Sequence, residues 1–587
     1  MNYEVKSKFT LFFILVTVGF VVFIATLLYW SSIDLRSPNL QMSEEKMSLR
    51  GSIISADNYV LSGSQRLYKV VVDTRNINPE KKELFIKLYC LYTNDKEARI
   101  KKIINQESGS VTLSYNIDSK NAEHLQSLAG KLLKLGVFKS YTRPNGIVFL
   151  HGMDIVQSGE LRVYPYKDAL SPIVGHVRKV EQDAITRRQG VKGIERYYED
   201  RLSFAQDSYI IGYRDAINSI ILNKKVKVKE PINGQDIQLS IPLKLQKMVE
   251  RKLDLHKEKL GAKEIIAVVM ESGTGKIVSL ASSNRYDVNS FKKDEYPFLN
   301  IQAAEYIYEP GSVMKPIVYA LLLKNGKIVP NDIVRTHNGR YTMGKFTITD
   351  EHRFESEWIT AKNAIIHSSN VGMAQLAQKL DPESYFSGLK SFGFGQKSGV
   401  DLSQENAGAI PTVNQLTSEI ARGSTGYGYG INVNFLQLIK AFNVFNNDGL
   451  MINPKIAEYI IDKQNIRHDI RNEEPQRVIP ANIANSIKQT LIETVTEGTG
   501  TRAFVEGVTV GGKTGTAQMA QGGVYLRRYN SSFIGFANDN DGAKFTIGVL
   551  VIEPSRNYFG AQSAAPIFKD VVKGMIEDGK LHALQGN

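Results

Sequence analysis

An apolar segment near the N-terminus restricts the architecture of this chain more than any other feature. The run Phe9–Ile33 contains no charged residue, and Tyr29 and Trp30 lie near its end. About 20 apolar residues can cross a bilayer as a helix, and such aromatic side chains favour the membrane interface. The run is too long for the core of a cleaved signal peptide, and no small-x-small cleavage site follows it. We therefore predict a membrane anchor at 9–33, a short cytoplasmic tail at 1–8, and translocation of the rest.

The remaining chain has the composition of a globular protein. Of the 587 residues, 42% are hydrophobic and 23% are charged, which suits two or more domains with their own cores. The net charge of +13 is spread along the chain, without an arginine-rich arm or a nucleic-acid recognition motif. We expect no nucleic-acid partner, and a basic surface suits anionic lipid or a polyanionic wall. The single cysteine, Cys90, excludes an internal disulfide and is expected to be a small buried hydrophobe.

Two regions of different pattern follow the apolar segment. Residues 34–50 are polar and aperiodic, which predicts a stalk. From Arg50 to about Lys229, short strand-like runs alternate with amphipathic helical patterns, such as the leucine spacing at 121–138. We therefore expect an elongated mixed α/β domain, a pedestal, over 34–230.

Beyond residue 230 the pattern predicts an α+β domain. Two β-rich runs flank the glycine-containing turn at 272–275, which indicates a hairpin. Three further strand-like runs lie late in the chain, and helical patterns separate them from the hairpin. We predict one antiparallel sheet packed between helices, with its first two strands distant in sequence from the others. This domain is expected over 231–580, followed by a tail at 581–587.

Ser312 and Lys315 form the most informative of four Ser-x-x-Lys matches. Pro316 lacks an N–H and is tolerated only in the first turn, so a helix should begin near Ser312. Positions i and i+3 share a helix face. Lys315 would lie at the positive end of the helix dipole, ahead of an apolar run, and both effects disfavour its ammonium form. A neutral lysine can accept the proton of a serine hydroxyl.

A second candidate segment reads Lys513-Thr514-Gly515-Thr516 in a strand-like run. On a strand, Lys513 and Gly515 share one face, and Thr514 and Thr516 share the other. We expect Gly515 to leave room for a substrate backbone. A lysine with hydroxyl neighbours is suited to holding a carboxylate.

Ser368 and Asn370 lie between two helical patterns, in the sequence Ser-Ser-Asn. A hydroxyl and an amide at such a junction commonly serve only as a helix cap. Their position alone leaves a capping role and a role in a site equally open. A second match to the Lys-Ser/Thr-Gly pattern, at Lys397, follows a glycine-rich run and is expected to be a structural loop.

The three motifs occur in the order Ser312, Ser368, Lys513, and this order makes them informative as a set. It is the Ser-x-x-Lys, Ser-x-Asn, Lys-Thr-Gly set of the penicillin-recognising acyl-serine enzymes. The segments YEPGSVMKP, SSNVGMAQLA, EGTGTRA and GGKTGTAQ resemble a class B penicillin-binding protein, as do RGSI and GIERYYEDRL in the first domain. Two segments depart from the family pattern: residues 54–58 replace an Asp-Arg-x-Gly turn, and Asn434-Phe435 replaces Thr-Pro.

The resemblance implies the penicillin-binding transpeptidase fold and a D,D-transpeptidase that cross-links peptidoglycan stem peptides. Ser312 would form the acyl-enzyme, with stem peptides or β-lactams, and Lys315 would be its base. The N–H groups of Ser312 and Thr516 would hold the oxyanion. The remaining roles implied are proton relay by Ser368, orientation by Asn370, and binding of the terminal carboxylate by Lys513, Thr514 and Thr516. Gly515 is also expected to bind substrate.

The resemblance also implies partners and a location. No metal or organic cofactor is expected, and the nine histidines show no H-x-H or H-E-x-x-H spacing. The bulk of the chain would lie in the periplasm on a single-pass anchor in the inner membrane, beside a polytopic glycosyltransferase and other division proteins. Glu309 and Ser-Ser-Asn-Val-Gly look more like the septal division type. The elongation type, a β-lactam sensor and a D,D-carboxypeptidase remain alternatives. A glycosyltransferase motif and a β-lactamase E-x-x-L-N motif after Asn370 are absent from the sequence.

Overall fold

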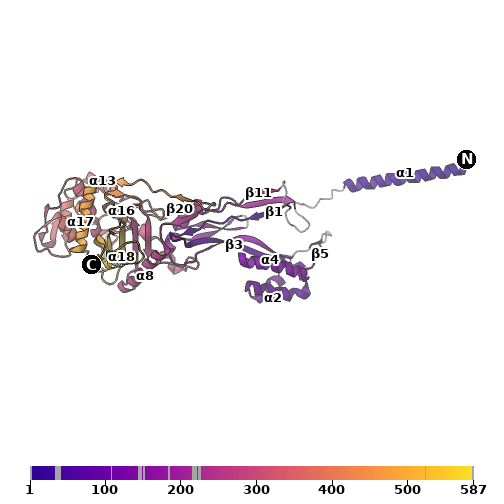
Figure 1. Cartoon of the computed structure of the whole chain (residues 1–587), viewed down its shortest axis with the longest axis horizontal. Coiled ribbons are helices and arrows are strands. Elements are labelled where there is room, and N and C mark those ends of the chain that lie inside the picture. Colours follow the sequence, from indigo (N-terminus) through magenta and orange to yellow (C-terminus); the bar gives the residue numbers. More distant parts are fainter. Residues whose placement is uncertain are drawn as a thin grey trace. The chain divides into compact units, whose positions relative to one another are not determined.

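The computed structural model describes residues 3–32, 41–106, 109–142, 148–149, 152–182, 185–213, 221, 226–522 and 524–584 (Figure 1). These residues form two compact units. The first combines the chain up to Met47 with residues 206–232, and the second combines residues 48–205 with residues 233–587. Each unit has hydrogen-bonded strands of its own.

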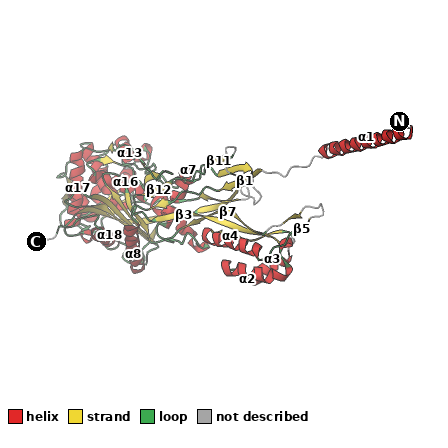
Figure 2. Ribbon diagram, turned by 45° about the vertical axis from the view of Figure 1, so that its right-hand side comes forward, coloured by secondary structure: helices red, strands yellow, loops and turns green. Residues whose placement is uncertain are grey.

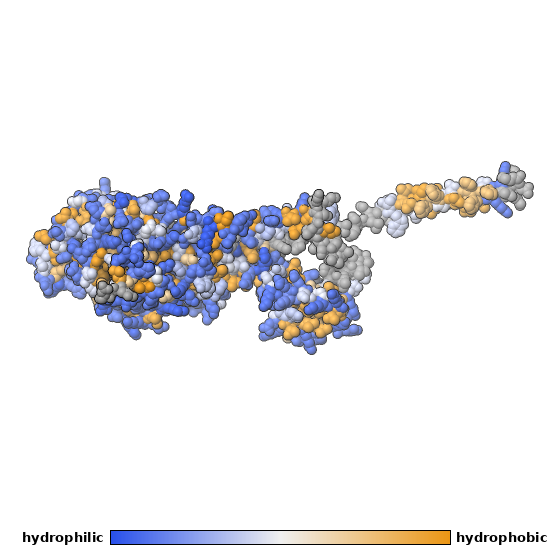
Figure 3. Space-filling view, in the orientation of Figure 1, coloured by the Kyte–Doolittle hydropathy of each residue, from blue (hydrophilic) through white to orange (hydrophobic). Residues whose placement is uncertain are grey.

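The first unit carries the predicted membrane span. Helix α1 (Tyr3–Ser32) includes Lys6–Ser32, which is the one helix among the described residues that is long and apolar enough to cross a bilayer. Apolar side chains lie exposed along most of this stretch (Figure 3). Such a surface is stable in a bilayer and costly in water.

The first unit also contains a three-stranded sheet. Strand β10 (Ser208–Tyr213) pairs antiparallel with β1 (Gln41–Lys46) on one side and with β11 (Lys227–Lys229) on the other. The stalk expected over 34–50 is therefore wrong for 41–46, while 33–40 lies outside the described residues. The partner of β1 is distant in sequence, so local periodicity did not reveal the pairing.

One sheet of the second unit joins strands from distant parts of the chain. Strand β12 (Asp236–Leu239) pairs in parallel with β2 (Ile53–Ile54) and antiparallel with β20 (Ala457–Ile461). Strand β2 pairs with β3 (Val60–Asp73), which pairs with β7 (Met153–Val163). Backbone hydrogen bonds therefore run from the pedestal, through β12, to a strand of the C-terminal part.

A helical layer packs beside β3. Helices α2 (Lys82–Thr93), α3 (Glu97–Gln106) and α4 (Ser119–Lys134) share an apolar core with β3 and its neighbour β4 (Ser110–Asp118). Helix α4 is the helix predicted from the leucine spacing. Cys90, on α2, is buried in this core as predicted.

The turn between β2 and β3 forms a hairpin although its sequence departs from the family pattern. Asn58 adopts a φ of 63°, a left-handed conformation that asparagine tolerates better than most residues. Ser55 Oγ accepts a hydrogen bond from the Tyr59 N–H at 2.9 Å and donates one to Asp57 Oδ1 at 2.6 Å. Side-chain hydrogen bonds and a left-handed asparagine thus close this turn.

The RGSI and GIERYYEDRL segments meet in a buried charge network. Glu195, on α6 (Gly193–Tyr197), is fully buried, and the Nε atoms of Arg50 and Arg162 each donate to it at 2.8 Å. Ser62 Oγ donates to the same carboxylate at 2.7 Å. Burial raises the pKa of Glu195, but Arg162 and Arg50 outweigh it and hold the pKa below its usual value. The carboxylate is therefore charged, and both guanidinium groups depend on it.

Replacing Glu195 with glutamine is expected to destabilise the pedestal by about 3–5 kcal/mol, because buried Arg162 loses the charge of Glu195 and buried Arg50 keeps only the partly exposed Glu199. The matched control is Glu199→Gln. Glu199 also pairs with Arg50, but its side chain is 17% exposed and Arg50 keeps Glu195. Denaturant unfolding of the two variants measures the difference. Equal destabilisation by both substitutions would contradict the central role of Glu195.

A five-stranded antiparallel sheet forms the centre of the C-terminal part (Figure 2). Its order confirms the predicted union of the early hairpin with the late strands. In spatial order the strands are β14 (Ile277–Ser282), β13 (Glu264–Glu271), β25 (Lys544–Ile552), β24 (Val524–Asn538) and β23 (Thr509–Gln521).

Helices cover both faces of this sheet, as predicted. Along β13, Ile265 and Ala267 pack in one core with α8 (Leu243–Leu260) and α18 (Ala564–Glu577). The alternate residues Ile266 and Val268 belong to a second core with α10 (Lys315–Lys324) and α16 (Phe435–Asn446). Strand alternation therefore builds two apolar layers from one run of residues.

The helices that carry the candidate residues begin close to their predicted positions. A 3₁₀ turn over Gly311–Met314 precedes α10 (Lys315–Lys324). The pattern at Ala361–Leu380 is split into α11 (Ala361–Ile366) and α12 (Asn370–Ala377). Helix α17 (Ala481–Thr496) packs against β23.

Helix α16 (Phe435–Asn446) begins with the second departure from the family pattern. The Asn434 side chain accepts a hydrogen bond from the Gln437 N–H at 2.8 Å, and the Gln437 side chain accepts one from the Asn434 N–H at 2.8 Å. This is a reciprocal cap. Asparagine therefore starts the helix without a Thr-Pro pair.

Candidate active site

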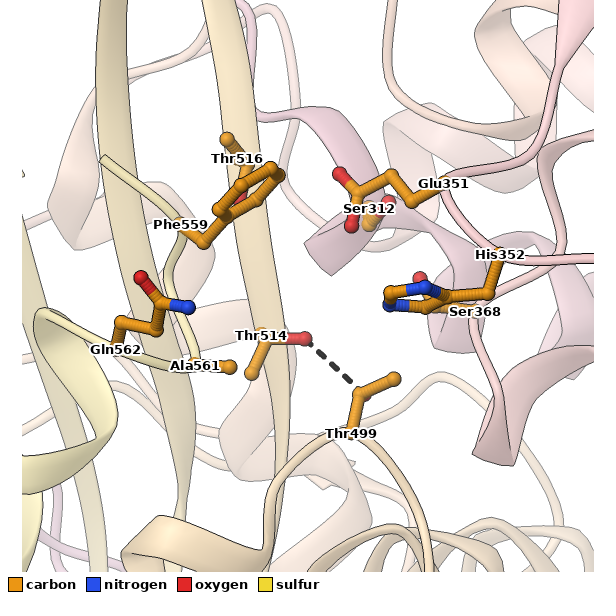
Figure 4. Close-up of a pocket in the computed structure, with 10 residues that line it drawn as sticks. All are labelled: Ser312, Glu351, His352, Ser368, Thr499, Thr514, Thr516, Phe559, Ala561 and Gln562. Atoms are coloured by element: carbon orange, nitrogen blue, oxygen red, sulfur yellow. Dashed lines mark hydrogen bonds between the residues drawn. The ribbon is translucent and has the colours of Figure 1, made fainter. Parts of the chain in front are cut away.

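The three sequence motifs meet at one cavity of about 280 Å³ in the C-terminal part (Figure 4). Side chains from the 3₁₀ turn before α10, the junction before α12, strand β23 and three loops surround it. Its lining consists of Ser312, Glu351, His352, Ser368, Thr499, Thr514, Thr516, Phe559, Ala561 and Gln562.

Ser312 is placed by a turn that lies against β23. Gly311 has a φ of 63°, and a Cβ at this position would come 3.2 Å from the Thr516 carbonyl and 3.3 Å from Ala517 Cβ. Glycine therefore permits both the left-handed backbone and the close approach to the strand. Ser312 follows directly, half-buried, with its side chain at the cavity beside Thr516.

Lys315 is the first residue of α10 and is fully buried. Its Nζ donates to the Ser368 carbonyl at 2.6 Å, to Asn370 Oδ1 at 2.8 Å and to Ser368 Oγ at 3.1 Å. Burial lowers the pKa of Lys315 to about 7, against the opposing effect of Asp350 and Glu351. The predicted loss of basicity is therefore present. Among the described residues, no hydrogen bond joins Lys315 to Ser312; the lysine reaches the second motif.

At the junction before α12, one serine caps the helix and the other contacts Lys315. Ser369 is the N-cap: its Oγ accepts from the Gly372 N–H at 2.9 Å and donates to Asp350 Oδ2 at 2.9 Å. Ser368 has a left-handed φ of 62° and turns its hydroxyl and carbonyl towards Lys315. The neighbouring serine takes the capping role, which leaves Ser368 and Asn370 free to bind the lysine.

Asp350 fixes this junction from a segment that sequence reasoning did not single out. Its Oδ1 accepts from the N–H groups of Asn370 at 2.5 Å and Val371 at 3.0 Å. A carboxylate at the first turn of α12 satisfies donors that have no partner within the helix. It thereby holds Asn370 in contact with Lys315.

Strand β23 presents its two faces as predicted. Thr514 and Thr516 line the cavity, and the Thr514 hydroxyl lies 3.1 Å from that of Thr499 (Figure 4). Lys513 is fully buried, with Nζ 3.3 Å from Thr514 Oγ1 and 3.5 Å from Thr499 Oγ1. Burial lowers the pKa of Lys513 well below its usual value, and the nearby Lys315 adds to this. Two buried lysines of weakened basicity thus lie near one cavity.

Gly515 has a packing role inside the protein that the sequence did not reveal. A Cβ at this position would come 2.4 Å from Ser532 Oγ, 3.0 Å from Val313 Cγ1 and 3.2 Å from the Pro310 carbonyl. These are neighbours inside the protein, so the glycine allows β23 to pack against β24 and the turn that carries Ser312. The expectation that Gly515 also leaves room for a substrate backbone stays a prediction.

Several cavity residues escaped the sequence analysis. Glu351 and His352 lie in an exposed loop after β17 (Phe346–Thr349) that has neither periodicity nor a motif. Thr499 lies in EGTGTRA, a segment used only for the family resemblance. Phe559 and Gln562 lie in the loop before α18, which no chemical pattern marks.

The cavity has no metal-binding constellation of its own among the described residues. Asp539, Asp541 and His582 are the one group of histidine and carboxylate side chains among the described residues that is close enough to hold an ion. None of these lines the cavity. Hydroxyls, a carboxylate, an imidazole and an amide line the cavity, and the buried Lys315 and Lys513 contact two of the hydroxyls.

Comparison with known families identifies the chain. Residues 265–573 match the penicillin binding protein transpeptidase domain, and residues 45–239 match the penicillin-binding protein dimerisation domain. The chain belongs to the class B penicillin-binding proteins.

Several relatives of known name are about equally similar. Stage V sporulation protein D of Bacillus subtilis is 30% identical over 72% of this chain and 65% of its own length. The probable peptidoglycan D,D-transpeptidase PbpC of Pseudomonas aeruginosa is 30% identical over 71% of this chain and 70% of its own. The probable peptidoglycan D,D-transpeptidase PenA of Neisseria flavescens is 30% identical over 66% of this chain and 94% of its own length. The chain thus spans just under two thirds of the Bacillus relative.

Solved structures share the fold. Penicillin binding protein 2X from Streptococcus thermophilus superimposes with a TM-score of 0.74 at 20% identity, covering 93% of this chain and 83% of its own. Penicillin binding protein 3 from Mycobacterium tuberculosis, complexed with aztreonam, superimposes with a TM-score of 0.66 at 22% identity, covering 92% of this chain and 98% of its own. These similarities confirm the predicted α+β transpeptidase fold behind a pedestal.

Proposed function

We propose that this protein is a serine D,D-transpeptidase that cross-links peptidoglycan stem peptides. The observation that carries the proposal is the placement of Ser312 at a cavity beside the buried Lys315, whose pKa is about 7. A lysine that is substantially neutral near pH 7 can act as a base towards a serine. The names of relatives in Pseudomonas and Neisseria support the same reaction.

In the acylation step, Ser312 Oγ attacks the carbonyl of the penultimate D-alanine and loses its proton. Lys315 is the proton acceptor, and Ser368 Oγ, 3.1 Å from Nζ, relays the proton. A neutral amine has two hydrogens, which suit Asn370 Oδ1 and the Ser368 carbonyl, and its lone pair then faces the Ser368 hydroxyl. Terminal D-alanine leaves with the returned proton.

The oxyanion and the substrate carboxylate are placed on β23 and its neighbours. The Ser312 N–H lies at the start of a 3₁₀ turn, where donors have no partner within the turn. Together with the Thr516 N–H it would hold the oxyanion. Thr514 and Thr516 at the cavity, with the buried Lys513 behind them, would hold the terminal carboxylate. An amine of a second stem then displaces Ser312, forming the cross-link.

We further propose that the enzyme acts at the septum and is acylated by β-lactams. Glu309 and the sequence Ser-Ser-Asn-Val-Gly favour the septal type over the elongation type. Residues 9–33 would anchor the chain in the cytoplasmic membrane, with the bulk of the chain outside, beside a polytopic glycosyltransferase. Depletion in cells tests the role: filaments support the septal assignment, and rounded cells would contradict it.

The enzymatic proposal is tested with the purified full chain in detergent micelles. A peptide ending in D-Ala-D-Ala and an amine acceptor are supplied, and D-alanine release and cross-linked product are measured. We expect both, and suppression of both by benzylpenicillin. D-alanine release without a cross-linked product would instead favour a D,D-carboxypeptidase. Acylation by penicillin without turnover of any peptide would favour a β-lactam sensor.

A further inference from the structure

The carboxylate of Glu309 stands three residues before Ser312 and lacks a full set of partners. Its Oε1 accepts from the Gly430 N–H at 2.7 Å and from the Tyr525 hydroxyl at 3.4 Å. Its Oε2 is buried and has no hydrogen-bond partner among the described residues. Burying a negatively charged oxygen without a hydrogen-bond donor is energetically unfavourable. The site is therefore incomplete in the structure of the chain alone.

No positive side chain compensates this carboxylate in the part of the chain that the structure describes. The groups that act on its pKa are burial, which raises it, and the donors of Gly430 and Tyr525, which lower it; the pKa lies above its usual value. Elsewhere in this protein, buried carboxylates such as Glu195 are neutralised by arginine. Glu309 lacks a cation, and a ligand can supply one.

Three tyrosines lie near the carboxylate. Tyr427 and Tyr429 have ring centroids 5.5 Å apart, and Tyr429 meets Tyr525 edge-on at 5.6 Å. The negative charge of Glu309 raises the pKa of all three phenols, after burial, which shows that it acts on the whole group. A carboxylate beside aromatic faces is a combination that binds ammonium groups. Tyr525 is 47% exposed and forms the side of the group that solvent reaches.

The tyrosine group contacts β23, the strand that lines the cavity, through Tyr429. The Gln518 N–H donates to the Tyr429 hydroxyl at 3.4 Å, and Gln518 is two residues beyond Thr516 on β23. Strand residues advance about 3.3 Å each, so the two positions are separated by about two residues of extended peptide. The Gly311 N–H also donates to the Gly428 carbonyl at 3.1 Å, which ties the Ser312 turn to the tyrosine segment. A peptide bound at Thr516 can therefore reach this group.

We propose that Glu309, with the rings of Tyr429 and Tyr525, binds the side-chain ammonium of a diamino acid in a stem peptide. This inference rests on the proposed transpeptidase function and adds a specificity site to it. The ammonium can belong to the stem that acylates Ser312 or to the stem that supplies the attacking amine. In the second case the ammonium passes its proton to Glu309 Oε2, and the neutral amine then attacks the ester carbonyl of the acyl-enzyme and releases Ser312. In either case Tyr525 turns aside to admit it, and the ammonium becomes the missing partner of Oε2.

The first arm of the test concerns the acyl donor. D-alanine release is compared for Nα-acetyl-L-lysyl-D-alanyl-D-alanine and its Nα,Nε-diacetyl form, which lacks the ammonium. If the donor stem supplies the cation, the wild type prefers the first peptide by about tenfold, the effect of one charged hydrogen bond in a partly exposed site. Glu309→Gln keeps the size and the Gly430 contact, and is expected to remove this preference.

The second arm concerns the attacking amine. The diacetylated donor is held constant, Nα-acetyl-L-lysinamide is the acceptor, and the ratio of transfer to hydrolysis is measured. If the acceptor stem supplies the cation, Glu309→Gln lowers this ratio about tenfold. The control variant is Glu553→Gln on β25's C-terminal side, whose carboxylate pairs with Arg528 and Lys263 and which should alter neither ratio.

The proposal is overturned if Glu309→Gln changes neither the donor preference nor the transfer ratio, or if it lowers the rates with all probes equally. Should that variant fail to fold, the wild type decides: equal rates with both donors, and transfer that shows no saturation with the acceptor, would overturn it. Absence of D-alanine release from either donor counts against the transpeptidase function. Release without selectivity in either arm counts against the ammonium site alone.

Discussion

Replacing Ser312 with alanine is expected to abolish covalent labelling by a fluorescent penicillin. The hydroxyl is the nucleophile of the proposed acylation, and removal of a nucleophile costs more than about 10⁴-fold in rate. The half-buried side chain lies at the cavity, so its truncation should leave thermal unfolding close to that of the wild type. Labelled protein is measured by gel fluorescence after denaturation.

The chain provides a matched control for this experiment. Ser387 also lies three residues before a lysine, but it is exposed on α13 (Pro382–Ser391) and donates only to the Ser384 carbonyl. Ser387→Ala should therefore be labelled like the wild type. Persistent stoichiometric labelling of the Ser312→Ala protein would disprove the site assignment.

Substitution of Lys315 by arginine is expected to slow acylation about 10³-fold, within the range that a general base contributes. A guanidinium group stays protonated near neutral pH, so it cannot accept the serine proton. Because arginine is larger and the site is fully buried, Lys315→Met is the companion variant, which lacks both charge and basicity. Stopped-flow acylation with penicillin measures the rates, and Lys390→Arg on α13 is the control.

The pH dependence of acylation tests the same lysine without a mutation. Its pKa is about 7, so the neutral fraction rises as the pH increases through 7. The wild-type rate should therefore increase about tenfold per pH unit below pH 7 and level off above it. A rate that is independent of pH between 5 and 8, or a near-normal rate in Lys315→Arg, would contradict the assignment.

Local sequence rules predicted the features that local physics determines. Pro316 placed the start of α10, and strand alternation correctly assigned Thr514 and Thr516 to the cavity side of β23. The hairpin at β13 and β14 followed from its turn. Burial of Lys315 followed from the apolar run after it.

The remaining features depend on contacts between distant segments. The lysine binds Ser368 and Asn370 because Asp350 fixes the start of α12, and Asp350 lies in a loop without periodicity. The reason for Gly515 appears only when its neighbours, Ser532 and Val313, are known. The sequence around Glu309 favours the septal type, but the lack of a partner for its Oε2 depends on how the tyrosine segment folds.

Strand β12 limits where this chain can be cut or fused to another. Because β2 and β20 flank it on either side, cutting the chain before residue 231 would leave one edge of β12 without its hydrogen-bonding partner. Exposed strand edges recruit other chains and promote aggregation. The pedestal therefore covers an edge of β12 that the C-terminal part alone would leave exposed, and a fusion that exchanges one part must keep both strands that pair with β12.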